Sequence, residues 1–200
     1  LLYILTTKYD LATIYGLNGK SYDNEILEKY QRDNLEIIKG NLIKQVSFNN
    51  DTVSLNGDFN SSGILIGGCL DVLRNMLGTS YDNTLKFIHK YRNYKIIWYF
   101  DIYNMGSVDV YLTLLQMKNM GYFKYSDTII FGKVLFPHIE CEMTYQEVSQ
   151  KVFGHQNIII DAEIGHVKPV FTTINGSLGK VTYHHNQMTL EMELLDEDIS

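Results

Sequence analysis

The stretch Lys95-Ile-Ile-Trp-Tyr-Phe-Asp101 decides the fold, because its apolar residues follow one another without a polar break. A strand with one face in water alternates apolar and polar residues, whereas a strand buried on both faces is a continuous apolar run. The stretch therefore predicts a strand inside a sheet that is covered on both faces. Asp101 then places a carboxylate at the end of that strand, where α/β proteins often carry functional groups.

The segments on either side of this run alternate between expected strands and helices. Upstream, residues 63–66 form a short apolar strand that leads through Gly67-Gly68 into a helix over 70–77. The other expected elements are a helix over 25–39, a helix over 108–120 that Ser107 caps and that buries Val108, Tyr111, Leu112 and Leu115, strands over 128–131 and 157–160, and a hairpin over 180–183 and 188–192. Strands that alternate with helices and end in a hairpin indicate a mixed α/β fold.

The composition is that of an ordinary globular protein. Of the 200 residues, 45% are hydrophobic and 20% are charged, which argues against a disordered chain. The net charge of −6 argues against general binding to a nucleic acid backbone, which needs clustered Lys and Arg. No apolar run approaches the roughly 20 residues that span a bilayer, and Lys8 and Asp10 interrupt the apolar N-terminal stretch, unlike a signal peptide. Cys69 and Cys141 form no Cys-x-x-Cys pair, so we expect reduced thiols and a cytoplasmic protein.

Two residues are candidates for acid–base chemistry. Asp101 ends the buried strand, although a carboxylate that only caps a loop would give the same pattern. His166 follows the strand over 157–160, and Gly165 lets the chain turn just before the imidazole. A single histidine in such a place is more often a surface residue with local hydrogen bonds than a general base. No Ser lies in a Gly-x-Ser-x-Gly elbow, so the pattern offers a base and an acid without a nucleophile.

A metal site is the alternative for the same region. Asp161 and Glu163 can share a face of a strand, and His166 lies close in sequence. Nothing else supplies a further ligand at a clear spacing, so no metal is expected. Gly67-Gly68 before a helix is similar to a phosphate cradle, but it lacks the Lys-Ser/Thr of a P-loop. Close packing of the strand-to-helix turn is the simpler reason for these glycines.

Six short motifs occur in a fixed order over about residues 58–195. They are Gly63-Ile-Leu-Ile-Gly-Gly-Cys-Leu-Asp71, Leu77-Gly-Thr79, Ile97-Trp-Tyr-Phe-Asp101, the helix through residues 115–123, Ile130-Phe-Gly132 and residues 161–169. In this order and spacing they resemble the LD-carboxypeptidase family of serine peptidases, which includes murein tetrapeptide carboxypeptidases and microcin self-immunity peptidases. In that family the first motif reads Gly-Gly-Asn/Cys-Leu, the third ends in a catalytic Glu, and the last carries the catalytic His.

The resemblance also implies how the chain is divided. Leu2–Gly16 is similar to the segment that follows the family's nucleophile motif Gly-x-Ser-Asp, with Tyr15-Gly16-Leu17 in place of His-Gly-Pro. The nucleophilic Ser and the oxyanion hole are therefore expected before Leu1. The expected parts are a remnant of the N-terminal nucleophile domain over 1–50, a linker over 51–62, a swivelling-type α/β C-terminal domain over 63–195 and an acidic tail over 196–200. The apolar residues that would lack partner strands and form an exposed patch are Leu1, Leu2, Tyr3 and Leu5.

The function that the resemblance implies is hydrolysis of an L,D amide by a Ser-His-acid triad. The substrate would be a murein tetrapeptide that releases D-Ala, or a related peptide conjugate. His166 would be the general base and Asp101 the acid that holds its tautomer. Gly67, Gly68 and Cys69 would bind the substrate. The resemblance implies no metal or organic cofactor, no nucleic acid or membrane partner, a cytoplasmic location and a homodimer.

One departure from the family leaves room for other functions. Asp101 stands where the family has Glu, which shortens the reach of the carboxylate by roughly 1.5 Å. A misplacement of about 1 Å can lower a catalytic rate on the order of a hundredfold. The absence of the Ser and the presence of Asp101 favour a non-catalytic peptide-binding relic, or a truncated inactive family member. A structural α/β domain whose pocket has no role is the third alternative.

Overall fold

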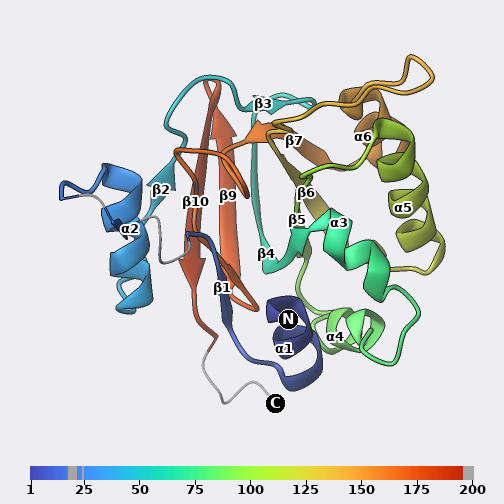
Figure 1. Ribbon diagram of the computed structural model, residues 1–200. Helices are drawn as coiled ribbons and strands as arrows, with labels where there is room; N and C mark the ends of the chain where they lie inside the picture. Colours follow the sequence, from blue (N-terminus) through green and yellow to red (C-terminus); the bar gives the residue numbers. More distant parts are fainter. Residues whose placement is uncertain (18–21, 24, 196–200) are drawn as a thin grey trace.

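The computed structural model, which describes residues 1–17, 22–23 and 25–195, contains an eight-stranded mixed sheet (Figure 1). Its strand order is β2-β10-β9-β4-β5-β6-β7-β3, and β1 pairs with β8 in a separate two-stranded sheet. The strands are β1 Thr13–Tyr15, β2 Gln45–Val46, β3 Val53–Ser54, β4 Phe59–Cys69, β5 Ile96–Asp101, β6 Ser126–Gly132, β7 Asn157–Ala162, β8 Thr173–Asn175, β9 Leu178–His184 and β10 Gln187–Glu193. The predicted mixed α/β fold is confirmed, while the acidic tail expected over 196–200 lies outside the described residues.

The helices lie on both sides of the sheet. They are α1 Leu2–Tyr9, α2 Lys29–Ile38, α3 Leu70–Leu73, α4 Thr84–Lys90, α5 Ser107–Asn119 and α6 Tyr145–Phe153, with a 3-10 turn at Arg74–Met76. The strands β4, β5, β6 and β7 are parallel to one another, and α3, α4, α5 and α6 belong to the crossovers between them, as parallel pairing requires. These helices cover one face of the sheet and α2 lies at the other (Figure 1). Among the described residues, no helix has the length and apolar character needed to cross a membrane.

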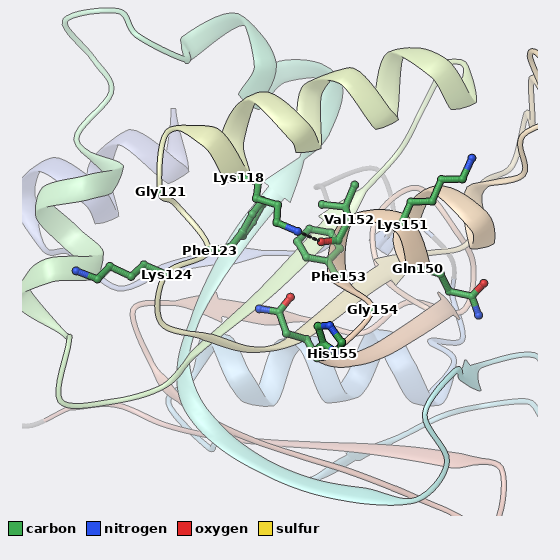
Figure 2. A pocket seen from close by; sticks show the side chains of 11 residues that line it. Lys118, Gly121, Phe123, Lys124, Gln150, Lys151, Val152, Phe153, Gly154 and His155 are labelled. Atoms are coloured by element: carbon green, nitrogen blue, oxygen red, sulfur yellow. Dashed lines mark hydrogen bonds between the residues drawn. The ribbon is translucent and has the colours of Figure 1, made fainter.

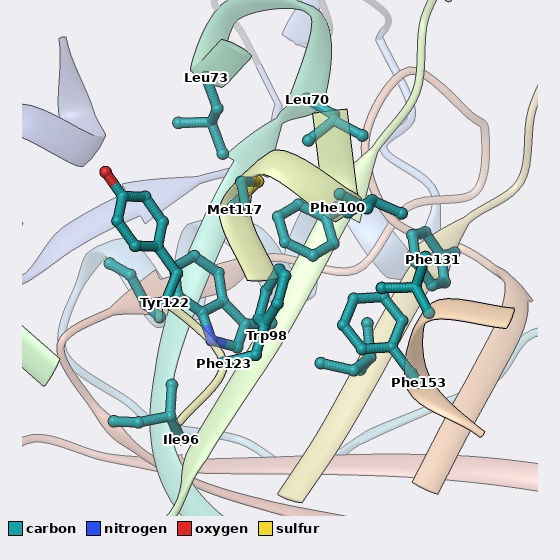
Figure 3. Close-up of a cluster of buried hydrophobic side chains, with 14 of the residues drawn as sticks. Leu70, Leu73, Ile96, Trp98, Phe100, Met117, Tyr122, Phe123, Phe131 and Phe153 are labelled. Carbon is teal, nitrogen blue, oxygen red and sulfur yellow. The ribbon is translucent and has the colours of Figure 1, made fainter. Parts of the chain in front are cut away.

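The central strand β5 is buried along its whole length, as its sequence predicts. Its alternate side chains enter two different cores: Trp98 packs in the core under α5 and α6, and Tyr99 packs in the core on the opposite face. Figure 3 shows Trp98 and Phe100 among the aromatic side chains of the first core, where Phe123 lies edge-on to Trp98 with 5.5 Å between ring centroids. Each such side chain contributes on the order of 2 kcal/mol through burial, so β5 holds the two layers together.

The segment predicted as a linker, 51–62, contains ordered strands. β3 lies within it and pairs with β7, and the first residues of β4 pair with β9. Its polar side chains are used in the sheet: the Ser61 hydroxyl donates a 2.6 Å hydrogen bond to Asp127. The Asn- and Ser-rich composition that indicated a loop thus reflects strands with polar partners, and the division of the chain into domains at this segment stays a prediction.

Helix α5 buries a different face from the predicted one. Its buried apolar residues are Val110, Leu114 and Met117, whereas Leu112 is 54% exposed. Apolar residues occur all around this helix, so their spacing alone did not select the buried face. The expected cap is also displaced, because Gly106 is the N-cap residue and the Glu140 carboxylate accepts the Val108 N–H at 3.2 Å.

The N-terminal segment, whose apolar residues we expected to lack partner strands, forms helix α1. Leu1 and Leu2 are exposed as predicted, but Tyr3 is buried and its hydroxyl hydrogen-bonds Thr84 at 2.8 Å. Packing against α4 therefore covers part of the expected apolar patch.

Candidate active site

The candidate site lies at the edge of the sheet where β4 and β5 end. Because these strands are parallel and in register, Cys69 at the end of β4 is paired with Asp101 at the end of β5. The Asp101 side chain is only 1% exposed. A buried carboxylate needs hydrogen-bond donors to remain ionised, so its partners define what this site can do.

His166 is the first partner of Asp101. The segment after β7 turns at Gly165, which has a φ of +92°, and brings the imidazole Nδ1 to 2.5 Å from Asp101 Oδ2. The carboxylate accepts, so the neutral ring donates from Nδ1 and leaves Nε2 free to take a proton. The His166 side chain is 48% exposed, so a substrate or nucleophile can reach that nitrogen. The two residues selected from the sequence thus meet in the geometry of an acid–base pair, and Asp101 is long enough to make the contact.

Gly165 makes this approach possible. A Cβ atom at this position would lie 2.1 Å from Asp101 Cγ, which no side chain can tolerate. Its left-handed backbone conformation also disfavours other residues. The glycine that we interpreted as a turn residue is therefore also the surface against which the Asp101 carboxylate rests.

Tyr15 is a second partner of Asp101, and this role could not be predicted from the sequence. Its hydroxyl donates a 2.9 Å hydrogen bond to Asp101 Oδ2, the oxygen that also contacts His166. Burial, and then the negative charge of Asp101, raise the pKa of the Tyr15 phenol far above its usual range. The contact depends on the pairing of β1 with β8, two segments about 160 residues apart, and no local pattern could have predicted it.

The role in substrate binding that the resemblance implies for Gly67, Gly68 and Cys69 stays a prediction, and the structure shows the packing around Gly67. A Cβ at Gly67 would lie 1.9 Å from the Tyr99 carbonyl oxygen, and the Gly67 N–H donates to Asn175 Oδ1 at 2.9 Å. Gly68 has a φ of +148°. Of the three predicted residues, only Cys69 is among those that line the cavity of the site. Burial, with smaller effects from Asp101 and Asp71, raises the pKa of the Cys69 thiol to about 11.

A cavity of about 530 Å³ opens beside the acid–histidine pair. Its lining residues are Tyr15, Gly16, Leu17, Cys69, Asp71, Val72, Tyr103, Gly165, His166, Val167 and Lys168. The Tyr103 ring lies 4.6 Å from the His166 ring, centroid to centroid. Asp71 accepts the N–H groups of Tyr103 and Asn104 at 3.0 and 2.9 Å. Lys168 takes part in none of the ion pairs found within residues 1–17, 22–23 and 25–195.

The residues of the alternative metal site are not brought together. Glu163 is buried, and its Oε1 accepts the N–H groups of Phe48 and Asn49, both at 3.0 Å. His166 contacts Asp101 instead of Glu163 or Asp161. Within the part of the chain that the structure describes, no group of three or more His, Cys, Asp and Glu side chains is arranged to hold a metal ion.

Another cavity, of about 550 Å³, lies between the C-terminal ends of α5 and α6 (Figure 2). Four basic side chains line it, but they do not converge on a ligand. Lys118 donates to the Val152 carbonyl at 2.5 Å, Lys151 lies 3.6 Å from Met143 Sδ, and Lys124 lies over the Tyr125 ring. Figure 2 shows Lys124 and Lys151 pointing away from each other, so these side chains do not form a converging basic site.

The chain is similar to a known protein family and to several solved structures. The model of the family described as LD-carboxypeptidase C-terminal domain matches residues 62–181. Muramoyltetrapeptide carboxypeptidase from Oxalobacter formigenes is similar in structure with a TM-score of 0.74 at 14% identity, over 97% of this chain and 65% of that one. An MccF-like protein from Streptococcus pneumoniae in complex with AMP gives 0.71 at 18%, over 95% and 66%.

A third similar structure is MccF in complex with glutamyl sulfamoyl guanosine, with a TM-score of 0.72 at 15% identity, over 98% of this chain and 65% of that one. The chain thus spans slightly less than two thirds of the length of these three structures. At such low identity the likeness establishes a common fold. No curated protein sequence matches the chain significantly.

Proposed function

This chain belongs to the LD-carboxypeptidase family, and on that premise we propose that it carries the acid and the base of a serine-type peptidase that hydrolyses an L,D amide bond. The observation that carries this proposal is the 2.5 Å contact between His166 Nδ1 and Asp101 Oδ2 beside an open cavity. A buried carboxylate that fixes the tautomer of an accessible imidazole is what a Ser-His-acid triad requires of its acid and base.

In the proposed mechanism, His166 Nε2 takes the proton of a serine hydroxyl as the serine attacks the amide carbonyl. Asp101 holds the ring and stabilises the imidazolium, and His166 then returns the proton to the leaving amine. The serine of this proposal precedes Leu1, because Leu2–Gly16 resembles the segment after the family's nucleophile motif. The helix α1, Leu2–Tyr9, supplies the helix half of the strand-turn-helix context that exposes such nucleophiles.

The proposed substrate is a small peptide with an L,D amide, either a murein tetrapeptide that loses D-Ala or a related peptide conjugate. The first choice follows muramoyltetrapeptide carboxypeptidase, and the second follows MccF, whose complex holds glutamyl sulfamoyl guanosine. A carboxypeptidase substrate ends in a free carboxylate, and Lys168 offers a cation without an ion-pair partner among the described residues at the cavity. The proposal includes a homodimer in the cytoplasm and no metal or organic cofactor.

The test is to follow release of D-Ala from a murein tetrapeptide by the full-length gene product. His166→Ala removes the base and is expected to lower kcat on the order of 10⁴-fold. His155→Ala, which lines the other cavity, is the matched control and should turn over at the wild-type rate. Unchanged turnover in His166→Ala would remove this residue from the mechanism.

A peptide-binding protein without catalysis is the second candidate. It is favoured by Asp101, which stands where the resembled family has Glu, beside an open cavity. Calorimetric titration with a murein tetrapeptide, with product release followed in parallel, separates the two functions. Binding without release by the full-length protein supports the second candidate, and release supports the first.

A further inference from the structure

Tyr15 joins the acid–histidine pair from a part of the chain remote from both residues. It is the last residue of β1 and is paired with Thr173 of β8. From there its hydroxyl reaches Asp101 Oδ2 at 2.9 Å, while His166 Nδ1 reaches the same oxygen at 2.5 Å. A carboxylate oxygen has two lone pairs, so one atom can accept both donors at once.

The direction of the Tyr15 hydrogen bond is fixed by chemistry. An ionised carboxylate only accepts, so the phenol must donate, and a bond from a neutral donor to a buried charge is stronger than one between neutral groups. Because Asp101 is 1% exposed, water contributes little to its solvation. Tyr15 therefore stabilises and orients the carboxylate together with His166.

Tyr15 is itself rigidly held. Its ring lies 5.8 Å from the Tyr99 ring, centroid to centroid, and its backbone carbonyl accepts the Thr173 hydroxyl at 3.3 Å. On another side, Asp101 abuts Gly165, where even a Cβ would collide with the carboxylate. The carboxylate is thus held between a fixed donor and a backbone surface, which limits its rotation.

We propose that Tyr15 is a positioning residue of the acid–histidine pair, whose hydroxyl holds Asp101 in the orientation that keeps His166 in its Nδ1–H tautomer. Its importance for turnover rests on the proposed function, whereas its effect on the tautomer does not. Without the phenol O–H, Asp101 can rotate or take its stabilisation from another donor. The His166 ring then loses the fixed acceptor that selects Nδ1–H over Nε2–H.

The other polar groups that line the cavity beside His166 do not take the place of Asp101 as the acceptor of the imidazole N–H. Asp71 accepts the N–H groups of Tyr103 and Asn104, whereas the His166 ring nitrogen contacts Asp101. Cys69, whose thiol pKa is raised to about 11, remains a neutral thiol near neutral pH. Lys168, on the same loop as His166, is a cation and cannot accept the imidazole N–H.

The experiment is ¹⁵N NMR of the imidazole nitrogens in this chain, in wild type, Tyr15→Phe and Tyr99→Phe, at a pH where the rings are neutral. The His166 signals are assigned by their loss in His166→Gln. Tyr99→Phe is the matched control, because it removes a buried phenol whose hydroxyl bonds Asn175 rather than Asp101. Wild type and Tyr99→Phe should show His166 as Nδ1–H, and in Tyr15→Phe the ratio of Nδ1–H to Nε2–H should fall on the order of tenfold. An unchanged ratio in Tyr15→Phe, or an equal fall in Tyr99→Phe, would overturn the proposal.

Two further measurements examine the role of the Tyr15 hydroxyl. If Tyr15→Phe fails to fold, 3-fluorotyrosine incorporated at position 15 keeps the shape and strengthens the donor, so the Nδ1–H fraction should equal or exceed that of wild type. A lower fraction would count against the role of the hydroxyl. In the full-length protein, Tyr15→Phe should lower kcat roughly 10- to 100-fold while KM stays within about twofold. An altered tautomer without any turnover in wild type would reject the proposed function and leave the positioning role intact.

Discussion

Gly165→Ala tests most sharply how the backbone shapes the site. The added Cβ would lie 2.1 Å from Asp101 Cγ, about 1.3 Å closer than the 3.4 Å at which ordinary contacts begin. The carboxylate or the loop must move by that amount. A displacement of about 1 Å can lower a catalytic rate on the order of a hundredfold, and complete loss of the His166–Asp101 contact raises the loss toward 10⁴-fold. We therefore expect kcat to fall between these limits.

The assay for this variant needs a control for backbone strain. Gly57 also has a positive φ, of +81°, but a Cβ there meets nothing within 4 Å. Gly57→Ala thus carries the cost of the left-handed backbone, on the order of 1 kcal/mol, without the collision. We expect both variants to lose thermal stability, and only Gly165→Ala to lose D-Ala release and the Nδ1–H tautomer of His166. If Gly165→Ala kept D-Ala release and the Nδ1–H tautomer at the level of Gly57→Ala, the close approach of Gly165 to Asp101 would not control the site.

Further predictions concern the cavity. Because its thiol pKa is raised to about 11, Cys69 should react slowly with iodoacetamide at pH 7, and its rate of alkylation should rise about tenfold per pH unit until the pH approaches 11. The exposed Cys141 is expected to react first. Peptide mapping by mass spectrometry that found Cys69 alkylated first at pH 7 would contradict this prediction. Lys168→Met should raise the Kd of a peptide acid roughly tenfold and leave that of the matching peptide amide unchanged, and calorimetry that showed equal losses for both would argue against a carboxylate contact.

The parts of the fold that the sequence predicted are those in which burial dominates. The apolar run that ends at Phe100 is a strand buried on both faces, and 128–131 and 157–160 lie within β6 and β7. The terminal hairpin is also confirmed as β9 and β10, with His185 and Asn186 in left-handed conformations at its turn. In each of these cases the pattern of neighbouring residues reflects the environment directly.

The features that could not be predicted depend on contacts between distant segments. The buried face of α5 is selected by packing against α6, and the cap of α5 comes from Glu140 on a later loop. Polar residues at the start of β4 indicated a linker because their partners, such as Asp127, are remote in sequence. Local propensity is overridden by tertiary contacts in all of these places.

The candidate site shows the same division. Asp101 could be selected because it ends a recognisable strand and His166 because it follows one, and the family resemblance then related them to each other. Tyr15 could not be selected, because its role arises from the β1–β8 pairing. That Asp101 reaches the imidazole could not be predicted either, since the 2.5 Å contact depends on the close approach at Gly165.

We propose that Asp101 and His166 act together as the acid and base of a peptidase. The most direct measurement is the rate of D-Ala release from a murein tetrapeptide by the full-length protein, in wild type and Asp101→Asn. The amide has nearly the size of the carboxylate but can donate to His166 Nδ1 and favour the wrong tautomer, so kcat should fall on the order of 10⁴-fold. Equal rates in the two proteins, or no release by a folded wild-type protein, would show that this pair does not carry out the reaction.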